Sequence, residues 1–399
     1  MLKLDYLLMN LKNKILVVGP ISDFGGREIE VKNITDALVN DFDVDLLSTI
    51  PMTKDSVAIL NNKKHSWSTV DKKIFNSNLF IKLTSSVCKI LYGRKEPAYR
   101  FIGNKLNHKF FSFNKKYFSV LKKEISKYDI IIFSGELTTK WLEEVIVFCN
   151  EFKKNIIIRT TGTIKYIPES INSLLSHVEI ILVHSNINRQ VLLSFIKKNV
   201  IIIDQTTLLE KELLAIEINK TSKQLTYGYL GRFSKEKGTL EMLNVFVNLR
   251  RKIIVAGSGT LLIEVKKLSK NNKHIEYIGE LSGPEIVEFY KQIDVLVIPS
   301  FEESGPLVGV EAMSAGKLIL STRVGAMMDR LEKTDNQFWF DINDEKTLIE
   351  QIKNIDSLNI DVLKQIRNKN RVIYKQKYSR KVIAKQYLSI VNNSNIKSI

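Results

Sequence analysis

The chain alternates short apolar runs with helical patterns, and this alternation restarts once, near residue 224. Residues 14–19 (KILVVG) lead through a glycine-containing turn into a helical pattern, and residues 129–135 (DIIIFSG) precede another. Runs that are apolar throughout are typical of parallel strands covered by helices on both faces. The chain is therefore predicted to be an α/β protein. The other strands expected in the first half are residues 44–49, 155–162, 179–185 and 199–204.

The second half repeats this architecture without repeating the sequence. Residues 345–370, and the chain from about residue 372 onward, are predicted to be helical, whereas residues 52–127 are predicted only as helices and loops. A length of 399 residues allows two domains with separate cores. We expect the two halves to meet near residues 205–225. The strands expected in the second half are residues 226–233, 252–259, 274–281, 294–300 and 317–325.

Cysteine usage and hydropathy indicate the compartment. Two cysteines, Cys88 and Cys149, are too few for a disulfide framework or a zinc site and fit a reducing compartment. No apolar run approaches the roughly 20 residues of a membrane-spanning helix. Residues 1–14 (MLKLDYLLMNLKNK) lack a small-residue cleavage site and are interpreted as a leader into the first strand, not a signal peptide. A cytoplasmic protein is expected.

The formal net charge of +17 implies an anionic partner: nucleic acid, anionic lipid or a phosphorylated substrate. Residues 89–127 contain eleven basic and two acidic residues, interleaved with aromatic ones such as Tyr92, Phe110 and Phe118. Such a segment can lie on an anionic membrane surface or grip nucleic acid. It can equally be an ordinary amphipathic helix whose aromatic residues belong to the core.

Residues 299–311 place carboxylates around a helix start. Glu303 precedes Pro306, and Glu311 lies eight positions after Glu303. Proline suits the first helical turn, so the N–H groups near Leu307 and Val308 stay free and, backed by the helix dipole, attract phosphate. The pattern indicates a site for a ligand with hydroxyls and phosphates, such as a sugar nucleotide. The alternative is a solvated acidic loop followed by a core helix.

A second loop, residues 231–238 (GRFSKEKG), follows the first strand of the second half. Gly231 permits a tight turn, and Arg232 and Lys237 come just beyond the carboxyl end of the strand, where parallel sheets bind ligands. A guanidinium and an ammonium are a natural pair for clamping a diphosphate. The alternative is an ordinary exposed basic loop.

Glycines follow other strands without forming a known nucleotide fingerprint. Gly25 and Gly26, after the first strand, permit close approach of a ligand to the backbone, but G-x-G-x-x-G is absent. Gly257 and Gly259 are interpreted as turn glycines near the ligand, because the Gly-Lys-Ser/Thr of a phosphate-binding loop is missing.

Two further features are weighed as chemistry and as structure. The acidic stretch at residues 41–45 (DFDVD) could bind a metal, but its carboxylates precede an apolar strand instead of ending one. His184 ends a predicted strand and could face a ligand or be an ordinary polar strand end. No nucleophile–base pair of the Ser/His/Asp kind is found.

The C-terminal half resembles the family 4 glycosyltransferases, retaining enzymes of the GT-B fold. The resemblance covers about 150 residues and keeps the order and spacing of the family's motifs. These motifs are Gly231-Arg232 with Lys237-Gly238, residues 255–259 (VAGSG), Asp294 with Pro299-Ser300, Glu303 with Glu311, Ala312-Met313 with Gly316, and Gly325.

The resemblance implies two Rossmann-like, doubly wound domains facing each other across a cleft. Residues 1–210 would form the acceptor-binding domain, with the glycine turn Gly25-Gly26 on the acceptor side. Residues 211–374 would bind the nucleotide-sugar, and a C-terminal helix at about residues 375–399 would cross back to the N-terminal domain.

The resemblance also implies roles for site residues. Arg232 and Lys237 would neutralise the diphosphate leaving group in place of a metal ion. Glu303 would bind hydroxyls of the transferred sugar, and Glu311 the ribose hydroxyls. No cofactor or metal is expected beyond a UDP- or GDP-sugar co-substrate. The remaining donor-binding candidates are Gly231, Gly257, Gly259, Ser304, Gly305, Leu307 and Val308.

Two departures from the family pattern bear on the site. The family has an aromatic residue and glycine where this chain has Gly305-Pro306, so the sugar contacts are expected to differ. Many members also carry a histidine after the fifth strand of the N-terminal domain, where this chain has Arg159 to Thr163 (RTTGT).

We therefore expect a cytoplasmic glycosyltransferase, peripheral on the inner face of the cell membrane. It would move a hexose-type sugar to a carbohydrate acceptor, lipid-linked, in bacterial surface polysaccharide biosynthesis, and would not bind nucleic acid. The alternatives are a sugar-nucleotide epimerase of the same fold and a non-catalytic basic binding protein.

Overall fold

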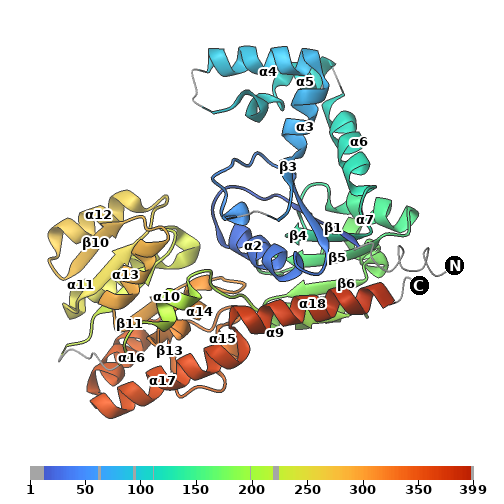
Figure 1. Cartoon of the computed structure of the whole chain (residues 1–399). Coiled ribbons are helices and arrows are strands. Elements are labelled where there is room, and N and C mark those ends of the chain that lie inside the picture. Colours follow the sequence, from blue (N-terminus) through green and yellow to red (C-terminus); the bar gives the residue numbers. More distant parts are fainter. Residues whose placement is uncertain are drawn as a thin grey trace. The chain divides into compact units, whose positions relative to one another are not determined.

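The computed structural model describes residues 13–61, 64–92, 96–110, 112–197, 199–218 and 224–396. The chain divides into two compact units. The first contains the chain up to Val183, residues Arg189–Ile201, and the C-terminal segment from Ala384; the second contains His184–Asn188 and Ile202–Ile383. Each unit is built on its own parallel sheet (Figure 1).

In the described part of the chain, the first unit has a seven-stranded sheet in the order β3-β2-β1-β4-β5-β6-β7. The chain builds outward from β1 in one direction and then from β4 in the other, so the sheet has its topological switch point between β1 and β4. Its strands are β1 (Lys14–Gly19), β2 (Asp43–Ser48), β3 (Trp67–Thr69), β4 (Ile130–Gly135), β5 (Asn155–Thr160), β6 (Ile180–Val183) and β7 (Val200–Ile202).

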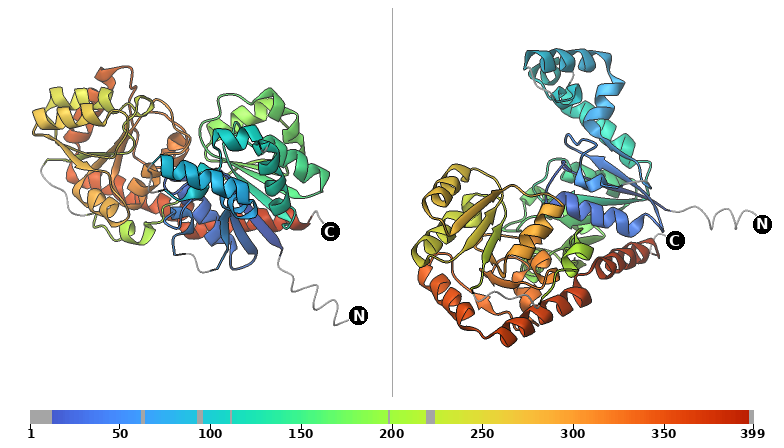
Figure 2. Two further views of the ribbon diagram at one scale, coloured as in Figure 1. Left: turned by 90° about the horizontal axis from the view of Figure 1, so that it is seen from above. Right: turned by 60° about the vertical axis from the view of Figure 1, so that its left-hand side comes forward.

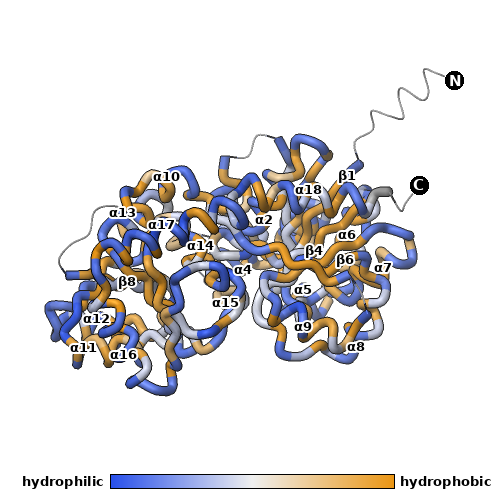
Figure 3. The backbone as a smooth tube through the Cα atoms, turned by 90° about the horizontal axis from the view of Figure 1, so that it is seen from below, coloured by the Kyte–Doolittle hydropathy of each residue, from blue (hydrophilic) through white to orange (hydrophobic). Residues whose placement is uncertain are grey.

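The central strands of this sheet are buried because both faces are covered by helices. Every residue of β4 is buried, and Figure 3 shows β4 and β6 in the hydrophobic colour. The helices of the first unit include α4 and α5, which lie away from the sheet. They are α2 (Gly26–Leu38), α3 (Val70–Ser77), α4 (Leu79–Leu91), α5 (Lys105–Phe110), α6 (Phe113–Ile125), α7 (Leu142–Glu151), α8 (Glu169–Asn172), α9 (Asn186–Phe195) and α18 (Arg380–Ile396).

The last helix, α18, returns to the first unit and is fixed there by a buried polar cluster. The Arg159 guanidinium, at the end of β5, lies 3.0 Å from the Glu30 carboxylate of α2, and both side chains are almost fully buried. The Tyr387 hydroxyl of α18 donates to the same carboxylate. Arg159 therefore has a structural partner, and the helix that the sequence predicts to cross back does so.

In the described residues, the second unit has a six-stranded sheet in the order β10-β9-β8-β11-β12-β13. Its switch point lies between β8 and β11, which pair in parallel. The strands are β8 (Tyr227–Leu230), β9 (Ile253–Ala256), β10 (Ile275–Gly279), β11 (Val295–Ile298), β12 (Leu318–Ser321) and β13 (Phe338–Trp339).

Alternate residues of the second sheet enter two separate cores, so this sheet also is covered on both faces. Ile253 and Val255 of β9 belong to one cluster, and Ile254 and Ala256 belong to the other. The helices are α10 (Glu210–Leu214), α11 (Thr239–Leu249), α12 (Leu262–Asn271), α13 (Pro284–Gln292), α14 (Leu307–Ser314), α15 (Met327–Leu331), α16 (Glu345–Ser357) and α17 (Ile360–Lys377).

The predicted fold class, with two doubly wound parallel sheets, is confirmed. The short strands β3 and β13 are not among the strands expected from the sequence. Residues 52–127, predicted as helices and loops, contain α3 to α6; α4 and α5 lie beyond the far ends of α3 and α6, away from the sheet (Figures 1 and 2).

The basic–aromatic segment at residues 89–127 proves to have two parts. In α6 the aromatic side chains of Phe113 and Tyr117 are buried in the core, as the structural alternative predicts. In α5 the side chain of Phe110 is exposed. Arg94, Lys95 and Phe111 of this segment, and the predicted leader up to residue 12, lie outside the described residues. No helix in the described ranges is long and apolar enough to cross a membrane.

Candidate active site

The switch point of the second sheet brings the two predicted ligand loops together. Because β8 and β11 are parallel neighbours, their carboxyl ends open at the same edge. The loop after β8 carries Arg232 and Lys237, and the loop after β11 carries Glu303. The backbone N–H of Phe301 donates to the carbonyl of Glu236 at 2.9 Å, so the loops are joined directly.

Lys237 and Glu303 form an ion pair across this junction. The ammonium contacts one carboxylate oxygen, which also accepts the Ser300 hydroxyl at 3.2 Å. Both side chains are mostly but not fully buried, with exposed fractions of 19% and 16%. A partly desolvated pair interacts more strongly than a surface pair and remains within reach of a ligand.

Arg232 takes a different position from Lys237. Its guanidinium lies 3.1 Å from the Glu236 carboxylate, four residues along the chain, and 68% of its side chain is exposed. The two predicted clamp cations therefore have separate carboxylate partners in this structure. Arg232 is free to turn toward a ligand, since an exposed ion pair is worth little, and its role stays a prediction.

The start of α14 offers unpaired N–H groups beside Glu303. The helix begins at Leu307, and Pro306 is its N-cap residue, one position earlier than a first-turn proline. No side chain caps this end. The N–H groups of Leu307 and Val308 thus retain the anion-binding potential predicted for them.

Glu311 lies in the second turn of α14 and is buried. Its carboxylate accepts the Tyr290 hydroxyl at 3.2 Å and the Thr207 hydroxyl at 3.4 Å. Burial raises the pKa of the Glu311 carboxyl to about 7, against the effect of these two hydrogen bonds. A carboxylate with hydroxyl partners suits exchange for ribose hydroxyls, the role that the family resemblance implies.

Ser304 and Gly305 are held by residues that follow β6 and β7. The Asn188 amide lies 3.2 Å from the Ser304 hydroxyl. A Cβ at Gly305 would lie within 3.4 Å of His184, Gln205 and Arg330, so these three residues pack closely against the loop. His184 therefore lies against the predicted donor loop. Its position after a strand is compatible with this contact but does not by itself predict it.

Gly257 and Gly259 let the loop after β9 approach the loop that carries Arg232. Gly257 has a φ of 137°, and a Cβ there would lie 1.8 Å from the carbonyl oxygen of Gly231. Gly259 packs in the same way against the backbone of Phe233. These glycines shape the site through backbone packing, and their predicted contact with a donor stays a prediction.

A buried ion pair beneath the α14 start was missed from the sequence. The Arg330 guanidinium makes two hydrogen bonds to Asp204, at 2.8 and 2.6 Å, and donates to the Pro306 carbonyl. Burial disfavours the charged guanidinium, but Asp204 outweighs it, and the pKa of Arg330 lies above its ordinary value. The two residues are 126 positions apart, and no local pattern connects them.

In the first unit, Gly25 and Gly26 lie in the loop after β1, at the switch point of their own sheet. Gly25 is the N-cap residue of α2, and Gly26 is the first residue of that helix. The neighbouring Arg27 lies 3.7 Å from Glu136, which follows β4. The predicted acceptor-side loop thus occupies the edge where doubly wound sheets bind ligands.

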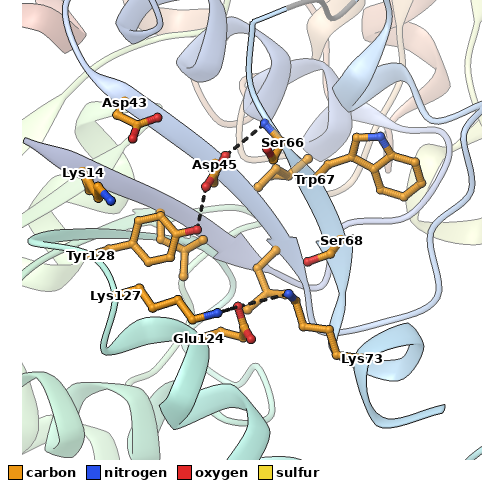
Figure 4. A pocket seen from close by; sticks show the side chains of 13 residues that line it. Lys14, Asp43, Asp45, Ser66, Trp67, Ser68, Lys73, Glu124, Lys127 and Tyr128 are labelled. Atoms are coloured by element: carbon orange, nitrogen blue, oxygen red, sulfur yellow. Dashed lines mark hydrogen bonds and ion pairs between the residues drawn. The ribbon is translucent and has the colours of Figure 1, made fainter. Parts of the chain in front are cut away.

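A pocket of about 370 Å³ lies at the opposite edge of the first sheet, near the amino ends of β1 and β2 (Figure 4). It contains Asp43 and Asp45 of the acidic stretch considered as a metal site. Asp45 accepts the Tyr128 hydroxyl at 2.7 Å and the Ser66 N–H at 2.9 Å. Asp45 is thus used structurally, as its position before an apolar strand suggested.

Known structures define the class to which this architecture belongs. The chain is similar to Anabaena HepE in complex with UDP and glucose, with a TM-score of 0.68 and 13% identity, covering 95% of this chain and 99% of HepE. At this identity the likeness shows the fold, which is the two-sheet GT-B fold of glycosyltransferases.

Residues 210–378 match the glycosyl transferases group 1 family. The chain is 26% identical over 171 residues to an uncharacterized glycosyltransferase of Methanocaldococcus jannaschii, covering 40% of this chain and 48% of that protein. It is also 26% identical over 178 residues to the capsular polysaccharide biosynthesis glycosyltransferase CapM of Staphylococcus aureus, covering 41% and 45%. The match thus spans less than half the length of either curated relative.

The predicted family is confirmed by this match. The match covers both ligand loops, α14 and Arg330, whereas Asp204 precedes the matched residues. The roles of individual residues are not part of the match and are treated below as proposals.

Proposed function

We propose that this chain is a retaining glycosyltransferase that moves a sugar from a UDP- or GDP-sugar to a carbohydrate acceptor. The observation that carries the proposal is the Lys237–Glu303 ion pair beside the uncapped start of α14, at the switch point of the second sheet. The pair combines a cation for phosphate with a carboxylate for sugar hydroxyls. The family supplies the reaction class.

In this proposal, Lys237 and Glu303 neutralise each other until the donor arrives. The donor diphosphate then takes the Lys237 ammonium and the N–H groups of Leu307 and Val308, and Glu303 is released to accept hydroxyls of the transferred sugar. Arg232 leaves its exposed contact with Glu236 and completes the clamp. Negative charge grows on the departing diphosphate, so cations fixed in advance lower the barrier.

The remaining contacts hold the nucleotide and position the loop. Glu311 accepts the ribose hydroxyls in place of Tyr290 and Thr207. Ser304 and Gly305 bring the backbone close to the sugar. In the proposal Gly231, Gly257 and Gly259 line the donor side, and no metal ion is assigned a role.

The acceptor is proposed to be a lipid-linked glycan of bacterial surface polysaccharide, reached from the inner face of the cell membrane. CapM, one relative, is a capsular polysaccharide biosynthesis glycosyltransferase, which supports this choice of pathway. We propose that residues 1–210, with Gly25 and Gly26, bind this acceptor and that residues 211–374 bind the donor.

Donor turnover in clamp variants tests the proposal. Lys237→Ala and Arg232→Ala should each lower kcat by about 100-fold or more, the usual effect of losing one preorganised charge contact, with unchanged circular dichroism. Lys235→Ala, in the same turn but exposed, is the matched control and should keep wild-type turnover. Wild-type kcat in both clamp variants would refute the assigned roles.

Ligand binding and product analysis test the donor and the reaction class. A thermal-shift series with UDP-, GDP- and ADP-sugars should identify one base that raises the melting temperature. Incubation of that donor alone should leave its sugar configuration intact. Isomerised sugar nucleotide without transfer would favour the epimerase alternative.

A further inference from the structure

We propose that an exposed apolar face of α4 docks onto an anionic lipid bilayer. This α4 face consists of six large side chains, each with more than half of its surface exposed. They are Leu79 (70%), Phe80 (66%), Leu83 (55%), Val87 (53%), Ile90 (77%) and Leu91 (77%).

The six side chains form one continuous stripe. At about 100° per residue, their positions fall within an arc of about 120° around the helix. The buried residues Ile81 and Ser85 lie outside this arc and attach α4 to the unit. The stripe lies opposite the attached side of α4, so it does not pack into the core of the first unit. Contiguous exposed apolar surface of this kind marks an interaction site.

The charges around the stripe select the partner. Lys82 and Lys89 lie on the side of α4 beyond one border of the arc, and neither α4 nor α5 contains an aspartate or glutamate. In α5, Lys105 and Lys109 accompany further exposed apolar side chains, including Phe110 at 65%. Apolar side chains bordered by cations fit the interface of an anionic bilayer, where the chains enter between headgroups and lysines contact phosphates.

The length of α4 fixes how it would lie. Thirteen residues span about 20 Å, too short to cross the roughly 30 Å hydrocarbon layer. The helix would therefore rest in the plane of the interface. It is held for this by its neighbours: the Thr84 hydroxyl lies 2.7 Å from the Asn107 side-chain oxygen of α5, and Asn107 is fully buried.

This assignment places the membrane contact at an earlier segment of the chain than the sequence pattern predicts. The sequence placed it in residues 89–127, but much of the aromatic content of that segment is core. The exposed apolar side chains instead begin at Leu79, before that segment, and the lysines of α4 and α5 supply the charge. The inference rests on the proposed function only in that a membrane-held acceptor gives the docking its purpose.

Vesicle co-sedimentation tests the docking without any catalytic step. The full chain should bind phosphatidylcholine vesicles with one-third phosphatidylglycerol, and bind pure phosphatidylcholine much less. Leu83→Ser/Ile90→Ser should lower the partition coefficient at least tenfold. The control Ile263→Ser, at an 81% exposed position on α12, should bind like wild type. Lys82→Gln/Lys89→Gln should lower binding about 25-fold, at about fivefold per lysine, on anionic vesicles only.

Equal vesicle binding by Leu83→Ser/Ile90→Ser and wild type would overturn the proposal. If Leu83→Ser/Ile90→Ser loses both vesicle binding and melting temperature, Leu83→Met/Ile90→Met, which keeps the apolar surface, is decisive. Failure of this methionine variant to bind vesicles would also overturn the proposal. Light scattering that showed a wild-type dimer and a monomeric serine variant, without vesicle binding, would assign the face to a second copy instead.

Failure of this inference is distinguishable from failure of the proposed function. Lys237→Ala should bind vesicles normally, since it lies in the second unit. Leu83→Ser/Ile90→Ser should retain donor hydrolysis with water as the acceptor. Loss of donor hydrolysis in the α4 variant would contradict a role limited to docking.

Discussion

Removal of the Arg330 guanidinium should strongly destabilise the second unit. Arg330→Met leaves the Asp204 carboxylate buried without its bidentate partner, whose nitrogen atoms lie 2.8 and 2.6 Å away. Breaking one side of a buried ion pair costs about 3–5 kcal/mol. In a unit of this size, about 1 kcal/mol shifts the melting temperature by 2–4 °C, so a fall of about 6–20 °C is expected.

The double variant Arg330→Met/Asp204→Leu separates charge from packing. With both charges gone, the destabilisation should be largely recovered, because a buried pair replaced by apolar residues is often close to neutral. Differential scanning calorimetry of the four proteins in this cycle measures the coupling between the two residues. Lys291→Met removes the exposed pair with Glu288 and should shift the melting temperature by about 2 °C or less.

The recovered double variant should still bind the donor poorly. Arg330 also holds the Pro306 carbonyl at the start of α14, and this contact is absent from the double variant. A raised KM in a protein of normal stability is therefore expected. The reasoning would be refuted by an Arg330→Met protein that melts within 2 °C of wild type, or by a double variant no more stable than the single one.

Two further predictions concern stability. Because burial raises the pKa of the Glu311 carboxyl from 4.5 to about 7 in the folded protein, stability is lost as the pH rises through this window and is constant above it. Glu311→Gln should not show this pH-dependent loss of about 3 kcal/mol. The melting temperature of the variant, relative to that of wild type, should therefore rise between pH 4.5 and 7. A difference in melting temperature that stays constant over this range would contradict the assignment. Gly257→Ala, with its Cβ 1.8 Å from the Gly231 oxygen, should destabilise by about 2 kcal/mol or more by thermal unfolding, whereas Gly103→Ala should not; equal melting temperatures would show that the loop relaxes.

Much of the fold could be predicted because its signals are local. Strands such as β4 are apolar from end to end and bounded by turn residues, so a short window of sequence identifies them. The strands β3 and β13 have three and two residues, too few to form an apolar run. They exist because a longer neighbour supplies their hydrogen bonds, which is information that the segment itself lacks.

The candidate site was predictable to the extent that it depends on chain order. Glycine, proline and charged residues after β8 and β11 gave the two loops, because parallel strands bring their carboxyl ends to one edge. The Asp204–Arg330 pair was not predictable, since it joins residues 126 positions apart. The α4 face was hidden for another reason: periodicity reveals an apolar stripe but not whether another element covers it.

The docking of α18 has a consequence for biosynthesis. Tyr387 contributes a hydroxyl to the Glu30 carboxylate that Arg159 also contacts, so the earliest-made unit contains a part that is translated last. During synthesis, the N-terminal sheet forms before α18 is translated. The Glu30 carboxylate therefore lacks the Tyr387 hydroxyl until the whole of the second unit has left the ribosome. Folding of the two units is thereby coupled in time. Premature termination near residue 384 would destabilise the first unit, although most of that unit is translated first.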